Sequence, residues 1–225
     1  MDFKSIMSLF REDDWAGDLV EMLDEMLALS GRMFTYTMGV VVRGETSADH
    51  NPELFDRDKR INSLMRKIRR RVVSRLSVGG HREEIPTALI FMNAVKDAER
   101  IGDYVKNLYE IADLMGDQPD RTLYEKWLDD RTSRIGVLIE ATREAFTVSD
   151  DEAAARVIAD ARRLSKECEA AIREITEWSG SVRDAVCLVL ALRFMKRVSS
   201  HLSNIATTVV MPVDLLDFYD EPGGS

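Results

Sequence analysis

Apolar residues recur at intervals of three and four positions along most of the chain, with polar residues between them. This spacing places the apolar side chains on one face of a helix, where they can pack into a core. The period-two alternation that is typical of half-buried strands does not extend over any useful length. The pattern therefore predicts an all-α protein and argues against a fold built on a parallel sheet.

Turn-forming residues divide the first half of this pattern into three helices. The first helix is expected to end near Gly44, the second to begin at Asn51 and Pro52, and the third to run from about Pro86 to Met115. Asparagine is a favoured N-cap, and proline is favoured at the first helical position. The side chains expected to face inward from the second and third helices include Leu54, Phe55, Ile61, Leu64, Ile68, Leu76, Leu89, Val95, Ile101 and Val105.

Three more helices are predicted after the turn-rich segment GDQPDRT at residues 116–122. Ser149 or Asp150 is expected to cap the fifth helix, because a small polar side chain followed by acids favours a helix start. Helices of about 25 to 30 residues would each be roughly 40 to 45 Å long. The sequence thus predicts two tandem three-helix bundles, formed by residues 1–118 and residues 119–225.

The third helix of each half carries a weakly repeated sequence. The segment AERIGDYVKNLYEIA in the first half aligns with MKRVSSHLSNIATTV in the second, and an arginine and an asparagine recur at matching positions. Glu99 and Asp103 of the first segment are opposite Lys196 and Ser200 of the second. The two halves can therefore be aligned residue by residue, as expected of an internal repeat, but the second half lacks the acids of the first.

Composition limits the classes of function. The formal net charge of −9 argues against a general nucleic-acid binder, which needs a positive field to neutralise phosphates. Cys168 and Cys187 lack the spacing of a disulfide framework or a zinc knuckle, which indicates buried thiols in a reducing compartment. The N-terminal apolar run is too short for a signal peptide, and the most apolar stretch, from Ala185, is shorter than the roughly 20 residues that span a bilayer. We therefore expect a cytoplasmic protein.

Two carboxylates one helical turn apart are the first candidates for a binding site. Glu99 and Asp103 in the segment ERIGDYVKN are neighbours on one helix face, where they repel each other unless a cation lies between them. Oxygen ligands at this spacing suit hard or borderline metals such as iron, manganese, magnesium or calcium. The alternative is an exposed acidic stripe that Lys96, Arg100 and Lys106 neutralise.

The second predicted helix offers further ligands. Asp58 and Asn62 share a helix face, and that helix is expected to pack beside the third, so Asp56, Asp58 and Asn62 are candidates to complete a metal site. The alternative is that the acids stabilise the start of their own helix, where its dipole favours negative charge.

A basic run follows on the same helix. Arg66 and Arg70 lie along one line of its surface, and Arg71 lies on another. In an acidic chain these residues form a local positive patch that suits an acidic protein surface or an anion. The alternative is a solvated face whose charges are paired with nearby acids.

The acidic and basic segments resemble those of the PhoU proteins, helical regulators of bacterial phosphate uptake built as tandem three-helix bundles. ERIGDYVKN matches the E/D-x-x-x-D motif on the family's third helices, and DRDKRINSLMRKIRR is similar to its second helix. The resemblance covers nearly the whole chain and implies metal-bound clusters, a dimer, and a role that couples a phosphate transporter to a sensor kinase. Because KRVSSHLSN carries Lys196 and Ser200 instead of acids, we expect the first half to hold the metal.

Three classes of function follow. The first is a non-enzymatic cytoplasmic regulator of phosphate uptake with a carboxylate metal site. The second is a metal-dependent oxidase or metal-storage bundle, which typically needs histidine ligands, and the third is a metal-free helical interaction module. His50, His81 and His201 are far apart, none lies in a Glu-x-x-His pair, and no Walker or GxSxG motif occurs. We therefore expect no enzymatic activity.

Overall fold

Six long helices and no strand make up the part of the chain that the computed structural model describes, which is residues 15–45, 52–79 and 82–212. The predicted all-α fold is confirmed. The helices are α2 (Trp15–Met38), α3 (Pro52–Ser77), α4 (Ile85–Leu114), α5 (Arg121–Val148), α6 (Asp151–Thr176) and α7 (Val182–Val210). Two short turns, η1 (Gly39–Arg43) and η2 (Arg82–Glu84), flank the α2–α3 and α3–α4 connections.

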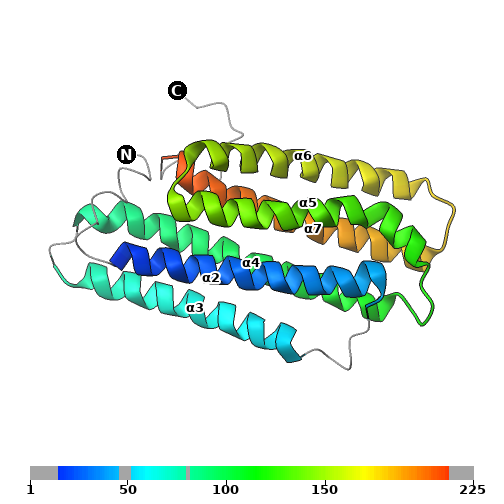
Figure 1. Cartoon of the computed structure of the whole chain (residues 1–225), viewed down its shortest axis with the longest axis horizontal. Helices are drawn as coiled ribbons and strands as arrows, with labels where there is room; N and C mark the ends of the chain where they lie inside the picture. The colour runs from blue at the N-terminus through cyan, green and yellow to red at the C-terminus, as the bar shows by residue number, and fades with distance from the viewer. Residues whose placement is uncertain (1–14, 46–51, 80–81, 213–225) are drawn as a thin grey trace.

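The long helices run side by side along the longest axis of the molecule (Figure 1). Helix α3 packs against α2 and α4, and α6 packs against α5 and α7. The two sets of three meet where α4 packs against α7 and α2 against α5. Helices α2, α4, α5 and α7 therefore form the middle of the molecule, with α3 and α6 on its outer sides.

The helix ends follow the local chemistry of the sequence. After α2 the chain makes one wide π-helical turn, η1, and Gly44 ends it with a φ of 67°, a conformation that favours glycine. Asp150 caps α6 by accepting a hydrogen bond from the backbone N–H of Ala153 at 2.9 Å, while Ser149 is the left-handed residue that ends α5. Of the two predicted caps, Asp150 is the correct one. Asn51 lies outside the described residues.

The apolar core continues through both sets of helices. Phe91 of α4 and Phe146 of α5 meet edge to face with ring centroids 5.8 Å apart, which joins the two sets. The connection between α4 and α5 spans residues 115–120 and contains the predicted boundary between the halves. Among the described residues, no helix is long and apolar enough to cross a membrane.

Three side chains that were expected to face inward are in fact exposed. Phe55, Leu76 and Leu89 keep 38%, 37% and 47% of their surface accessible. Phe55 and Leu76 lie near the two ends of the outer helix α3, and Leu89 lies near the start of α4, where fewer helices surround them. The ring of Phe55 still meets Tyr109 edge on, with centroids 6.5 Å apart. The prediction was wrong for these three side chains because the spacing of apolar residues does not show how many other helices surround a helix end.

Candidate functional site: a carboxylate cluster bridged by a lysine

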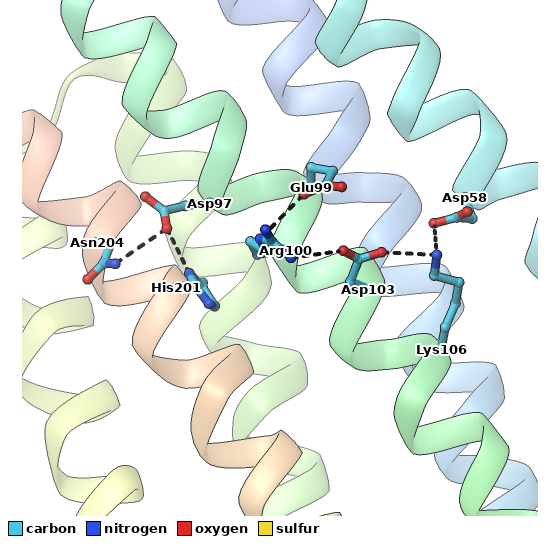
Figure 2. A network of polar contacts seen from close by, with 8 residues as sticks. All are labelled: Asp58, Asp97, Glu99, Arg100, Asp103, Lys106, His201 and Asn204. Carbon is cyan, nitrogen blue, oxygen red and sulfur yellow. Dashed lines mark hydrogen bonds and ion pairs between the residues drawn. The ribbon is translucent and has the colours of Figure 1, made fainter.

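The acids of the ERIGD segment face the neighbouring helix α3. Glu99 and Asp103 lie one turn apart on α4, and Asp58 of α3 lies across from them (Figure 2). Lys106 Nζ lies 3.0 Å from Asp103 Oδ1 and 3.0 Å from Asp58 Oδ1. One ammonium group therefore joins the carboxylates of two helices.

Glycine allows the two helices to approach closely at this point. A Cβ on Gly102 would lie 3.3 Å from Ile61 Cδ1 and 4.0 Å from Asp58 Oδ1. Ile61 is fully buried, so the helix contact is tight here. The glycine of ERIGD thus brings Asp58 within reach of the α4 acids.

The charges around Glu99 do not fully compensate its burial. Burial raises the pKa of Glu99 above its ordinary value, and the nearby Asp103 carboxylate raises it further. Arg100 and Lys106 act in the opposite direction, with Arg100 Nε 3.8 Å from the Glu99 carboxylate. An additional cation at this position would therefore stabilise the ionised form of Glu99.

Lys106 is held in its charged form. Burial alone would lower its pKa, but the hydrogen bonds to Asp103 and Asp58 outweigh burial, and the pKa lies above its ordinary value. The repulsion between carboxylates is thus relieved by an ammonium that belongs to the chain. Arg100 contributes as well, with Nη1 3.5 Å from Asp103 Oδ2.

The cluster has the donor atoms that a hard metal ion prefers, but Lys106 lies between two of them. Carboxylate oxygens are the usual ligands of such ions. In the described part of the chain, no group of three or more histidine, cysteine, aspartate or glutamate residues is arranged to hold a metal. The acids fit a metal only if the Lys106 ammonium moves away, so metal and lysine would compete for Asp58 and Asp103.

The other predicted ligands are placed differently. Asn62 donates a hydrogen bond from Nδ2 to Asp58 Oδ2 at 3.3 Å, so it holds the Asp58 carboxylate in place. Asp56 is exposed and pairs with Lys59 at 3.0 Å. The structure brings Asp58 and Asn62 to the cluster and leaves Asp56 outside it.

A second polar group joins the two halves and was missed by the sequence analysis. Asp97 of α4 is 1% exposed, and its Oδ1 lies 2.7 Å from His201 Nδ1 and 3.4 Å from Asn204 Nδ2, both on α7 (Figure 2). The His201 ring stacks on Tyr104 with centroids 5.5 Å apart. The sequence could have indicated that Asp97 is buried, because it lies three residues after Ala94, on the apolar stripe of its helix.

The basic residues of α3 are partly neutralised. Arg71 forms an ion pair with Asp18 of α2. Arg66 and Arg70 are exposed and form no ion pair with any residue that the structure describes. Arg70 and Arg71 also line a shallow depression of about 400 Å³ beside Trp15. The pairing with a nearby acid therefore holds for Arg71, and a docking role for Arg66 and Arg70 stays a prediction.

Six helices in two packed sets of three, with acids on the third helix facing the second, define a helical-bundle protein. The family model described as the PhoU domain matches residues 23–112. Among solved structures, the crystal structure of PhoU from Pseudomonas aeruginosa is similar to this chain, with a TM-score of 0.73 and 18% sequence identity. The alignment covers 88% of this chain and 96% of that one. No curated protein matches it.

Residues 23–112 therefore match the PhoU domain model, and the described chain has the same fold as that PhoU structure. The matched segment contains α3 and all but the last two residues of α4, and so includes Asp58, Glu99, Asp103 and Lys106.

Proposed function

We propose that this chain is a non-enzymatic regulator of phosphate uptake and phosphate signalling, acting in the cytoplasm. The observation that carries the proposal is the PhoU-domain match over residues 23–112, which includes the ERIGD motif. The PhoU-like arrangement of the six helices supports it over a broader length of chain. The partner would be a phosphate transporter or a sensor kinase at the cytoplasmic face of the membrane.

The exposed arginines of α3 suit contact with such a partner. Arg66 and Arg70 lie one turn apart on the outer helix and present two unpaired guanidinium groups among the described residues. Guanidinium groups bind carboxylates in a bidentate geometry. Arg66 and Arg70 would therefore bind an acidic surface of the transporter or kinase. Arg71 is already paired with Asp18.

A metal ion belongs to the proposal as a competitor of Lys106. Glu99, Asp103 and Asp58 would supply carboxylate oxygens, and Asn62 would orient Asp58. A divalent ion or ferric iron would supply positive charge that bridges α3 and α4. In its absence, the Lys106 ammonium makes the same connection. The first half would hold this ion, because Lys196 and Ser200 replace the acids in the second.

Two features of assembly complete the proposal. Residues 1–118 and 119–225 would be two copies of a three-helix repeat, since the third helix of each set, α4 or α7, packs against the outer helix of its own set and against its counterpart in the other set. The protein would form a homodimer. Light scattering at tens of micromolar protein tests this, and a mass corresponding to the 25.6 kDa monomer alone would exclude the dimer.

Cells that lack the chain test the regulatory role. The rate of phosphate uptake in phosphate-rich medium should change, and re-expression of the wild-type chain should restore it. A variant with Arg66→Glu and Arg70→Glu should restore it less well, whereas Arg193→Glu with Arg197→Glu, the same two changes one turn apart on exposed α7 surface, should restore it fully. Unchanged uptake in the deletion strain would exclude a role in phosphate uptake.

A further inference from the structure

A cavity of about 380 Å³ lies between α6 and α7, the second and third helices of the second set. Polar side chains dominate its wall. The basic residues are Arg162, Lys166 and Lys196, and the hydroxyl groups belong to Ser165, Ser200, Ser203 and Thr207.

The cavity occupies the place in the second half that the carboxylate cluster occupies in the first. Helices α4 and α7 are the third helices of the two sets, and each packs beside the outer helix of its own set. Counted from the first residue of each helix, Lys196, Ser200 and Ser203 of α7 stand where Glu99, Asp103 and Lys106 stand in α4. Acids that would bind a cation are thus replaced by a cation and hydroxyl groups.

The charge of the wall is positive, although the chain as a whole carries −9. One residue that lines the cavity is acidic: Glu169, which forms an ion pair with Lys196. The Lys196 side chain is 23% exposed, so this pair keeps the ammonium at the wall instead of free in solvent. A bound anion would share the ammonium with Glu169.

The hydroxyl groups supply neutral donors beside these charges. Ser200 donates to the backbone oxygen of Lys196 at 3.0 Å. Ser165 and Ser203 form no side-chain hydrogen bond with any other residue that the structure describes, so their hydroxyl hydrogens can turn toward a ligand. Lysine, arginine and serine together are the donors that proteins use for oxyanions with several acceptor atoms.

We infer that the α6–α7 cavity binds a phosphate-type oxyanion, either inorganic phosphate or the phosphate group of a larger molecule. Lys196 and Lys166 supply the charge, and Ser165 and Ser203 donate hydrogen bonds. A carboxylate ligand has fewer acceptor oxygens than a phosphate group, so it can accept hydrogen bonds from fewer of these side chains. The site is independent of the proposed regulatory role, because it depends only on the side chains of the cavity.

Calorimetric titration of the whole chain with inorganic phosphate, pyrophosphate and acetate tests this inference. Phosphate and pyrophosphate should bind saturably at one site per chain, more weakly as salt is added, and acetate should not. Lys196→Glu should weaken binding by about tenfold or more, because a charge-assisted contact becomes a repulsion. Glu169→Gln should tighten binding, because it removes the carboxylate that competes for Lys196.

Arg197→Glu is the matched control. Arg197 is the next residue on α7, is exposed and does not line the cavity, so the same change of charge there should alter affinity by less than about twofold. Lys166→Gln, on an exposed side chain, keeps the test decisive if the Lys196 variant does not fold. The inference would be overturned if neither phosphate nor pyrophosphate bound saturably, or if acetate bound equally well. It would also be overturned if Lys196→Glu and Arg197→Glu lowered the affinity for phosphate equally.

Discussion

Single side chains decide what the ERIGD segment of this chain can bind. The motif supplies Glu99 and Asp103, but the residue one turn further on, Lys106, provides the cation that relieves their repulsion. The same ammonium reaches Asp58 on α3. Whether the cluster holds a metal therefore depends on a lysine that the motif does not include.

Removing that lysine should favour a metal. In Lys106→Met the Asp58 and Asp103 carboxylates lose their shared ammonium, so manganese or magnesium should raise the melting temperature of this variant more than that of the wild type. Lys59→Met is the control, since Lys59 pairs with the exposed Asp56 at the same helical spacing. Glu99→Ala with Asp103→Ala should abolish the metal response. An equally small response in the wild type and in Lys106→Met would exclude the competition.

Glu99 should make stability depend on pH in a defined direction. Burial and Asp103 raise its pKa in the folded state, so its contribution is fully present below the unfolded pKa and is lost as pH rises through the folded pKa. Glu99→Gln should consequently be more stable than the wild type at pH 7, and this advantage should disappear near pH 4. Urea unfolding at both pH values measures this. Glu110→Gln, at an exposed position of α4, should show no such difference.

Cys168 should be chemically inert in the folded protein. Burial raises the pKa of its thiol to about 11, so only about one thiol in a thousand is ionised at pH 8, and the thiolate is the reactive form. Treatment with iodoacetamide followed by mass spectrometry should show no modification of Cys168 until the chain is unfolded in denaturant. Rapid labelling of the native protein would mean that α6 opens far more often than its buried position suggests.

At the scale of helices, much of the fold could be predicted because its causes are local. Gly44, Gly116 and Asp150 act through backbone conformation and capping, which the sequence carries directly. The contact of Asp97 with His201 could not be predicted, because it joins positions far apart in sequence and depends on the way α4 packs on α7. The bridging role of Lys106 was hidden for the same reason, since Asp58 lies on another helix.

Two glycines inside helices should respond oppositely to substitution. Gly136 of α5 has no atom within 4 Å of an added Cβ, so Gly136→Ala should stabilise the protein by about 0.5 to 1 kcal/mol through helix propensity. At Gly102 the same gain is offset by the contact with Ile61, and Gly102→Leu should cost about 1 to 3 kcal/mol through overpacking. Urea unfolding of the variants measures both. A stabilising Gly102→Leu would mean that α3 and α4 can separate at no cost.

At the scale of the whole molecule, a polar contact couples the two sets of helices. His201→Ala leaves the buried Asp97 carboxylate with Asn204 as its remaining described partner, and its Oδ2 already has none. Leaving a buried polar group without its partner typically costs about 1 to 3 kcal/mol, whereas the double variant Asp97→Leu with His201→Leu should cost less because both polar groups are removed together.

Urea unfolding of the single and double variants separates these cases. In a background that keeps only Trp15 in α2 or only Trp127 in α5 of the three tryptophans, fluorescence reports on each set of helices. Because the core continues through both sets, each variant should unfold in one transition by both probes. If His201→Ala shifted only the transition reported by Trp127, the two sets would be stabilised separately and the contact between α4 and α7 would not couple them.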